Sequence, residues 1–541
     1  MSEREFWVVL GVVGAGLAGY WGMWRGCGER GRRRLDWGVT WGVWLLVGMA
    51  SLALVVRHEP WRDELHTWLV TRDLSLGQLW HEMRWEGHLM LWQLVLHPFA
   101  RWGAPVWTLG AVSWAINWAT LWFFAKKAPF GAAAKAVAMA SVAFAYLNPV
   151  VSRCYVLVPP LLFGLAALWG ERDRRPLLFG GLVALLANTH LYLEGTAGLI
   201  ALVFAWENVW RRKDGKGWRE CGRQWAGLGL MAAGLALAVA QVAPTLWEPS
   251  RGWGWHCGWK ADLLAFLGLC RSWGWKAAAL AGAGWVGWAC WKRDKGMFWV
   301  YAGSLAYMVA FSVFLYSAMV MNRAVLWWPV MLFAGWGVLG TLAPPPPGFA
   351  GSLRSCGDPD VSPTRSATGS PLEGAFAGGG YGLGVELAVV LAGLALFRPD
   401  LMAADWRWEY DPLPGACKYV AETYGADAEV WIHGDEMSLE VARAYLGNTW
   451  DWRTGEKAER MCMALASWKG DRPFAGAVRE VFAKHPEKES LLVMGYPGGG
   501  SGLEWSDTEG EGVTVEYVGA ASVFGTTGEV VVMRTTRGKE K

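Results

Sequence analysis

The sequence has little charge imbalance and little organised cysteine. Its 541 residues carry 50 Lys and Arg against 47 Asp and Glu, a net charge of only +3, which gives no sign of a nucleic-acid or acidic partner. The nine cysteines are scattered, without a CxxC pair or a Cys/His set at zinc spacing. We therefore expect neither a disulfide framework nor a zinc module, and interpret the thiols as small buried apolar groups.

Signatures of nucleotide and metal chemistry are missing as well. The Gly-rich stretch 497–502 has no Walker or GxGxxG context, so we interpret it as a loop. The histidines and carboxylates near residue 64 could ligate a divalent cation, but no HExxH-type spacing supports it. We expect no obligatory metal or cofactor.

Apolar residues are what the chain has in abundance. Hydrophobic residues make up 53%, 41 of the residues are Trp, and mean hydropathy is +0.20. An ordinary soluble domain is less apolar. The first apolar run has no small-residue cleavage site, which indicates a retained helix. Spans of about 20 apolar residues predict twelve transmembrane helices, at 6–24, 38–56, 105–124, 131–148, 151–169, 177–190, 191–210, 224–244, 275–291, 297–316, 324–342 and 381–397.

Basic residues predict how the chain is oriented. They gather in five connections, which all fall on one side of the membrane if the twelve spans alternate, at 25–34, 126–127, 171–175, 211–219 and 292–295. Loops rich in Lys and Arg face the cytoplasm. We therefore expect a multi-pass protein of the cytoplasmic (inner) membrane, with the loop 57–104 and the C-terminal residues on the periplasmic or outer side.

These patterns predict a mostly α polytopic membrane protein with a small C-terminal soluble α/β domain. Residues 1–343 form the transmembrane domain, and 381–397 form the last transmembrane helix. Between them, 344–380 begins PPPPG and has the composition of a disordered cytoplasmic linker. Residues 398–541 form an external domain, which we expect to fold independently. Its expected helices are 415–424, 438–446 and 474–484, and its expected strands are 430–432, 491–494, 513–518 and 529–533.

The stretch 57–101 combines apolar flanks with an unusual number of titratable groups. It holds five histidines and six carboxylates, and ionisable groups at a membrane are functional candidates. An apolar stripe of Trp61, Leu65, Trp68 and Leu69 predicts one short helix, and a capping box starting at Ser75 predicts a second. We interpret both as amphipathic helices in the membrane interface. Residues 89–99 are too short to span.

A family resemblance rests on this loop. Trp61-Arg62-Asp63-Glu64, then Arg84-Trp85-Glu86-Gly87-His88 leading into Leu89-Met90-Leu91-Trp92, resembles the first external loop of GT-C glycosyltransferases. Bacterial protein mannosyltransferases and aminoarabinose transferases are examples. In the family, prolines usually follow the His, whereas Leu89 and Met90 stand here. The resemblance implies transfer of a sugar from a polyprenyl-phosphate donor to an external glycan, lipid or protein acceptor, with inversion at the anomeric carbon.

Such a transfer needs a base, and a carboxylate suits that task. Asp63 and Glu64 are the candidates, although carboxylates at a helix start are also favoured by the helix dipole alone. Glu86 and His88 lie where the loop re-enters the apolar phase and are candidates for donor contact. Glu86 could instead pair with Arg84, and His88 could be a satisfied interfacial histidine.

The leaving phosphate needs cationic partners, for which arginine is the best planar donor. Arg153 with Tyr155, and Arg323, open predicted spans on the side of the acidic loop. Each arginine could instead be a snorkelling anchor. Four polar residues at another external turn could line an acceptor pocket or simply cap helices: Asn188, His190, Tyr192 and Glu194.

Two functions of other classes compete with the enzyme. A transporter or flippase of lipid-linked saccharides should show inverted repeats and charges at mid-membrane. The sequence shows no internal repeat, and its charge cluster lies at the interface. The second competing function is that of a non-catalytic scaffold whose external domain binds components of the cell envelope.

Overall fold

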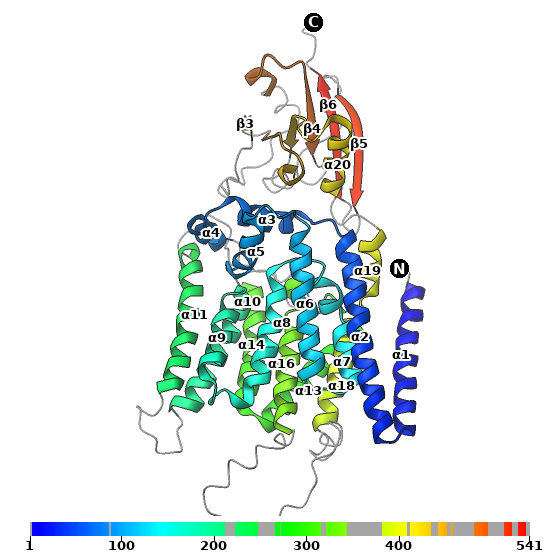
Figure 1. Cartoon of the computed structure of the whole chain (residues 1–541), viewed down its shortest axis with the longest axis vertical. Coiled ribbons are helices and arrows are strands. Elements are labelled where there is room, and N and C mark those ends of the chain that lie inside the picture. Colours follow the sequence, from blue (N-terminus) through cyan, green and yellow to red (C-terminus); the bar gives the residue numbers. More distant parts are fainter. Residues whose placement is uncertain are drawn as a thin grey trace, which may run out of the picture.

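The protein is a tall helical body capped at one end by a small sheet domain (Figure 1). The computed structural model describes most of the chain, with gaps that fall mainly in connections and in the C-terminal domain. The described residues are 3–85, 88–210, 222–246, 266–270, 272–314, 321–342, 381–407, 412–433, 442–451, 456–457, 481–495, 513–521 and 528–536. The predicted linker 344–380 lies outside them.

Each of the twelve predicted spans corresponds to helical structure in the body. The elements are α1 (Glu3–Gly26), α2 (Glu29–Arg57), α6 (Thr108–Lys127), α7 (Ala132–Ala140) with η2 (Ala143–Leu147), η3 (Cys154–Leu157) with α8 (Val158–Leu168) and η4 (Trp169–Glu171), α9 (Pro176–Ala187), α10 (Leu191–Ala205) with η5 (Trp206–Trp210), α11 (Gly222–Leu246), α13 (Trp273–Arg293), α14 (Lys295–Phe314), α15 (Met321–Ala324) with α16 (Trp327–Leu342), and α18 (Tyr381–Ala395). The body is mostly α, as the sequence predicts.

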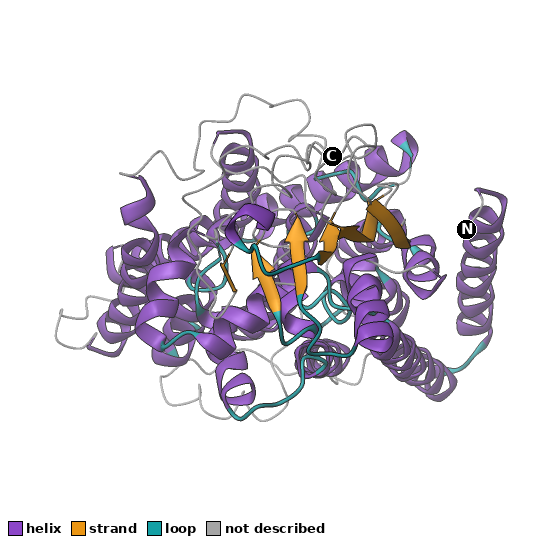
Figure 2. Cartoon of the chain, turned by 90° about the horizontal axis from the view of Figure 1, so that it is seen from above, coloured by secondary structure: helices purple, strands orange, loops and turns teal. Residues whose placement is uncertain are grey.

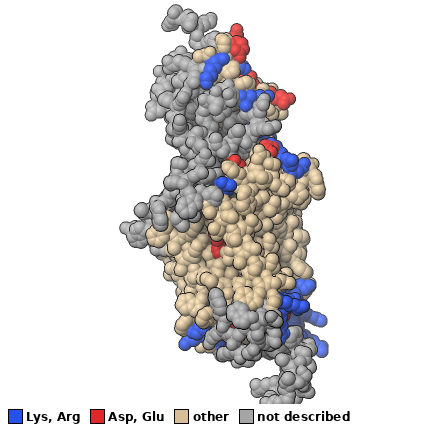
Figure 3. All heavy atoms as spheres, turned by 90° about the vertical axis from the view of Figure 1, so that its left-hand side faces the viewer, with Lys and Arg blue, Asp and Glu red and all other residues tan. Residues whose placement is uncertain are grey.

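The helical body has the surface of a multi-pass membrane protein. Five described helical segments are long and apolar enough to cross a bilayer: 29–57, 154–171, 222–243, 295–314 and 381–407. The face in Figure 3 shows a broad band with very few charged side chains, and Lys and Arg gather at its lower end. Exposed leucines and tryptophans on this body therefore belong in lipid rather than water.

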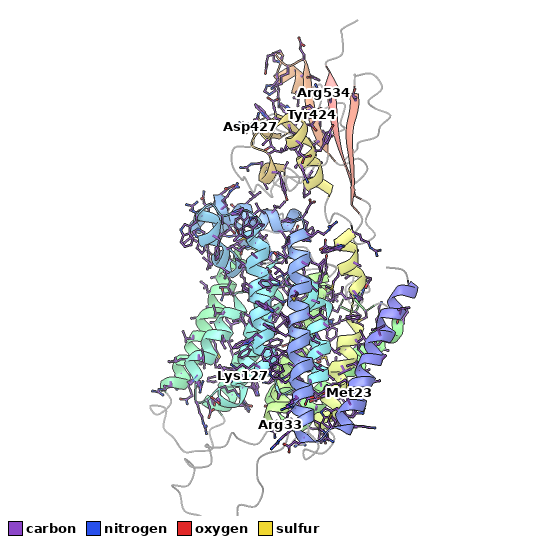
Figure 4. All side chains as sticks on the ribbon, turned by 45° about the vertical axis from the view of Figure 1, so that its right-hand side comes forward. Met23, Arg33, Lys127, Tyr424, Asp427 and Arg534 are labelled. Atoms are coloured by element: carbon purple, nitrogen blue, oxygen red, sulfur yellow. The ribbon has the colours of Figure 1, made fainter. Side chains whose placement is uncertain are left out.

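The basic connections gather at the end of the body away from the sheet domain. Figure 4 shows two of these basic residues at that end: Arg33 near the start of α2, and Lys127 at the end of α6. The connections at 171–175 and 292–295 lie at the same end (Figure 1). The common side predicted for these loops is therefore confirmed, while 211–219 falls outside the described residues.

A layer of short helices covers the opposite end of the body. It contains α3 (Arg62–Asp73), α4 (Leu76–Glu82), η1 (Met83–Trp85) and α5 (Leu91–Arg101). The capping box that starts α4 is present: the Ser75 amide donates to Gln78 Oε1 at 3.0 Å, and the Gln78 amide donates to Ser75 Oγ at 3.4 Å. Both predicted short helices are therefore confirmed.

The interpretation of α3 as a helix lying in the membrane interface stays a prediction, but its apolar stripe does not form a single surface. Leu65 is fully buried within the C-terminal domain, Trp68 belongs to the core of the helical body, and Leu69 packs with α4. His66 on the polar side is only 5% exposed. The helix is thus enclosed between two domains, and its stripe serves three separate contacts.

The C-terminal domain is a six-stranded sheet that lies over the helical body in the view from above (Figure 2). It follows α19 (Pro399–Arg407) and α20 (Pro412–Tyr424), and its strand order is β3-β2-β1-β4-β6-β5. Parallel pairing joins β1 to β2 and β4, while the other pairs are antiparallel. The strands are β1 (Val430–His433), β2 (Thr449–Asp451), β3 (Glu456–Lys457), β4 (Ser490–Gly495), β5 (Val513–Ala521) and β6 (Gly528–Thr536).

This sheet confirms the expected small α/β domain. All four predicted strands and the helix at 415–424 are present, whereas β2 and β3 were not predicted. Of the helices expected at 438–446 and 474–484, residues 442–445 and 481–484 are helical, and 438–441 and 474–480 lie outside the described residues. Figure 4 shows Tyr424 and Arg534 in this domain, where the guanidinium lies 5.3 Å from the ring centroid and joins α20 to β6.

The C-terminal domain is docked on α3. Its core is formed by Leu413, Ala416 and Val420 of α20 with buried residues of the sheet, and Leu65 of α3 completes it. Arg443 and Asp73 carry opposite charges 4.0 Å apart at the same junction. The prediction that this domain folds independently is not supported by a core that takes a buried leucine from outside the domain.

Candidate active site

Asp63 faces an arginine from a distant part of the chain. Its Oδ2 lies 2.7 Å from Nη1 of Arg153, and the two side chains are 21% and 8% exposed. Asp63 lies in the first turn of α3, where the helix dipole favours a carboxylate. The pair is therefore largely desolvated, yet Asp63 keeps a path to solvent.

Arg153 reaches α3 because the chain is not helical at this point. Regular helix α7 ends at Ala140, and η2 continues as a π-helical turn. Pro159 and Pro160 start α8, and a proline ring clashes with the carbonyl four residues earlier, so a helix cannot run unbroken through 155–160. The backbone around Ser152 and Arg153 is therefore left to face α3.

Glu64 is the neighbour of Asp63 but is fully enclosed. Its Oε1 accepts a hydrogen bond from the Ser152 amide at 2.5 Å, and its Oε2 accepts one from the Trp61 amide at 3.1 Å. The side chain is 1% exposed. Glu64 thus caps α3 and joins it to the segment that carries Arg153.

His58 holds Glu64 from the other side, and no sequence pattern pointed to it. Its Nε2 lies 3.0 Å from Glu64 Oε2, and its Nδ1 lies 3.0 Å from Asp405 Oδ2 on α19. Burial opposes the charged imidazole, but the two carboxylates outweigh it and raise the pKa of His58 to about 10. His58 is therefore an imidazolium between two carboxylates.

A cluster of two histidines and a tyrosine extends from Arg153. His88 Nε2 lies 2.8 Å from Arg153 Nη2, and it accepts this hydrogen bond because a guanidinium only donates. His88 and His190 form an isolated antiparallel bridge, with ring centroids 5.1 Å apart. Tyr155 Oη lies 3.4 Å from His190 Nε2 and accepts from Arg323 Nε at 3.3 Å.

Cationic side chains are part of this cluster, and they influence its histidines. Burial lowers the pKa of His190 well below its usual range, and His88, Arg323 and Arg153 add to this effect. Neutral His190 accepts from the Tyr192 amide through Nδ1, so its Nε2 carries the hydrogen. The cluster holds two guanidinium groups, those of Arg153 and Arg323. Such a site is suited to an anion.

Six of the seven predicted site residues lie in the part of the chain that the structure describes, and they come together. Asp63, Arg153, His88, Tyr155 and Arg323 form one connected series, while Glu64 adjoins it on the His58 side. Glu86 lies outside the described residues. Of the four residues assigned to an acceptor pocket, His190 joins the cluster, and Asn188 ties α9 to α11 by donating to the Gly234 carbonyl at 2.9 Å.

An apolar groove begins beside the cluster. It has a volume of about 590 Å³ between α5, α9 and α11, and it passes Met90 and Asn188, each two residues from a cluster histidine. From Leu177 to Asn188 it follows α9 for about 16 Å at the helical rise. Gln241, 1% exposed, lines it, and its Nε2 has no hydrogen-bond partner within the described structure.

The described residues do not form a metal site. Within the described ranges, no group of three or more His, Cys, Asp or Glu side chains is placed to hold a metal ion. The expectation that no metal is obligatory stays a prediction.

Comparison with known proteins gives a structural likeness only. No family profile and no curated protein sequence matches the chain. One similar solved structure is ArnT from Cupriavidus metallidurans bound to undecaprenyl phosphate, at 13% identity and a TM-score of 0.47, with 93% of this chain and 98% of that chain covered. ArnT in the apo state is similar at 13% identity and a TM-score of 0.36, with 86% and 96% covered. At these TM-scores the likeness does not identify the fold by itself.

Proposed function

We propose that the protein is a GT-C-type membrane glycosyltransferase that moves a sugar from a polyprenyl-phosphate donor to an acceptor on the side of the C-terminal domain. The observation that carries this proposal is the pairing of Asp63 with Arg153 in a cluster that holds two arginines, with an apolar groove whose lining residues Met90 and Asn188 are each two residues from a cluster histidine. A polyprenyl-phosphate sugar has the matching parts: an anionic phosphate, a sugar and a long apolar chain.

In the proposed reaction, Asp63 takes the proton of an acceptor hydroxyl. The resulting oxygen nucleophile attacks the anomeric carbon, the bond from that carbon to the phosphate oxygen breaks, and its electron pair leaves with the polyprenyl phosphate. Arg153 and Arg323 offset the negative charge that develops on the phosphate, and Tyr155 and His190 hold Arg323 in place. Attack opposite the leaving phosphate inverts the anomeric centre.

Asp63 is the better candidate for the base because it is reachable. Its carboxylate is 21% exposed, whereas that of Glu64 is 1% exposed and already accepts from two backbone amides. A base must approach within hydrogen-bond distance of the proton it removes. Glu64 is therefore assigned to positioning rather than to proton transfer.

The groove supports the assignment of the donor. Five of its leucines are between 43% and 53% exposed, namely Leu94, Leu177, Leu178, Leu185 and Leu237, so it is open on the side that faces lipid. A polyprenyl chain could enter sideways from the bilayer. The Nε2 of Gln241, which has no partner among the residues that the structure describes, lies in the same groove and could donate to an oxygen at the phosphate end.

The decisive experiment is turnover by Asp63→Asn in the full-length protein. Purified protein is given polyprenyl-phosphate sugars, and release of polyprenyl phosphate with glycosylation of the acceptor is followed by mass spectrometry. Loss of a positioned base should lower kcat about 100- to 10,000-fold while the polyprenyl phosphate still binds. Glu82→Gln is the matched control, because Glu82 is a carboxylate of α4 in the same loop, paired with His81.

Two outcomes would contradict the proposal. Full turnover by Asp63→Asn would show that another group is the base. Movement of an unchanged lipid-linked saccharide across vesicles, with no transfer to an acceptor by the wild type, would favour the transporter instead.

A further inference from the structure

Three buried side chains from three separate elements form a bridge beside the candidate active site. His58 follows α2, Glu64 lies on α3 and Asp405 lies on α19, and their side chains are 4%, 1% and 2% exposed. His58 joins the two carboxylates through its two ring nitrogens, each at 3.0 Å. Buried charges are costly unless paired, so this bridge holds its members in a specific geometry.

The bridge ends on the helix that leads into the C-terminal domain. Asp405 is in the last turn of α19, and α20 of the domain starts at Pro412. The next residue, Trp406, receives the guanidinium of Arg57 at 4.9 Å from its ring centroid. Two consecutive residues at the end of α2 therefore hold two consecutive residues of α19.

The other end of the bridge reaches the candidate base. Glu64 follows Asp63 in the chain, and Ser152 precedes Arg153. Glu64 binds the Ser152 amide at 2.5 Å, and Asp63 binds Arg153 at 2.7 Å. These two contacts are adjacent links between the same two segments, so a displacement of Glu64 displaces Asp63 relative to Arg153.

We propose that His58 is a positioning residue that couples the seating of α19, the root of the C-terminal domain, to the geometry of Asp63 and Arg153. The predicted effect of His58 on turnover rests on the proposed function. Its predicted effect on the hydrogen exchange of the α3 amides does not. The C-terminal domain then controls the transfer reaction through a contact made by α19, without supplying a group to the reaction itself.

The test uses the full-length chain with Asp405→Asn and His58→Gln, alone and together. Both substitutions preserve size but weaken the bridge. Misplacing reacting groups by a fraction of an ångström to an ångström costs up to about 100-fold, so we expect kcat to fall about 10- to 100-fold with KM for the lipid donor little changed. The kcat of the double variant should be no lower than that of the less active single variant, because the bridge acts as one unit.

A second measurement does not depend on the reaction. Hydrogen exchange of the α3 amides from Leu65 to Val70 should become about tenfold faster in Asp405→Asn, although the substitution lies on another element. Asp400→Asn is the matched control, because Asp400 is also on α19 and pairs with Arg398 rather than with His58. This control should change neither the exchange of α3 nor kcat.

The two measurements separate the two proposals. Unchanged exchange of α3 in Asp405→Asn, or fully additive losses in the double variant, would overturn the coupling role of His58. Faster exchange in a protein that transfers no sugar would support the coupling and overturn the proposed function instead. If KM for the lipid donor rises in both single variants while kcat is unchanged, the bridge shapes donor binding, and its proposed role in positioning the base is overturned.

Discussion

Asp63 and Glu64 are adjacent in the chain, yet their carboxylates lie in opposite environments. Asp63 pairs with Arg153 and is 21% exposed, whereas Glu64 is 1% exposed and bonded on both oxygens. The first turn of α3 turns successive side chains by about 100°, which directs one toward the cluster and the other toward His58. One acidic pair thus divides into a reachable carboxylate and a structural one.

This division predicts opposite effects of two isosteric substitutions. Glu64→Gln should lower the free energy of unfolding by roughly 2 kcal/mol, because an amide replaces a buried carboxylate that accepts from an imidazolium and two amides. Its turnover should fall less than that of Asp63→Asn, which should lose less stability because Asp63 is partly exposed to solvent. Thermal unfolding in detergent and turnover are measured on the same samples. The assignment is wrong if Asp63→Asn is the less stable protein and Glu64→Gln the less active one.

The pKa of His58 predicts how stability depends on pH. Its folded pKa of about 10 lies above the ordinary 6.5, so its contribution to stability is complete below about pH 6.5 and is lost as pH rises toward 10. Each pH unit in this window should remove at most about 1.4 kcal/mol. Unfolding of the wild type and His58→Gln is compared from pH 6 to 10. The difference between them should shrink as pH rises, and a difference that grows would refute the charged state.

The groove predicts a substitution that distinguishes donor lipids by length. Gly181 on α9 lines it, and a Cβ added there would meet open space. Gly181→Leu should therefore fold but fill part of the groove, which raises KM for a full-length polyprenyl donor and leaves a short-chain analogue unaffected. Gly229→Leu on α11 is the control, because its Cβ also meets open space and the residue does not line the groove. Equal effects on both donors would place the lipid chain elsewhere.

Local signals predicted the helical body well. Apolar length located the twelve spans, and the capping box at Ser75 located the start of α4, because both depend only on residues near each other in the chain. The strands of the C-terminal domain were located for the same reason. β2 was missed because only three residues, Thr449–Asp451, form it.

Contacts between distant segments could not be predicted. His58 and Asp405 are 347 positions apart, and the residues next to either one in the sequence do not predict that the two side chains meet. The stripe of α3 suggested a single apolar surface, whereas the helix is enclosed by two domains that take different members of the stripe. Arg153 and Tyr155 were correctly expected on the side of the acidic loop, but the hydrogen bonds that join them to His88 and His190 depend on how α7, α8 and α10 pack.

The burial of Leu65 in the core of the C-terminal domain also sets an order of assembly. The ribosome delivers α3 before the domain, so the place of Leu65 in the domain core stays unfilled until the domain reaches a correctly inserted α3. A chain with the loop 57–104 on the wrong side of the bilayer would leave that core permanently incomplete and open to proteases. A segment that is translated later thereby depends on the correct placement of one that is translated earlier.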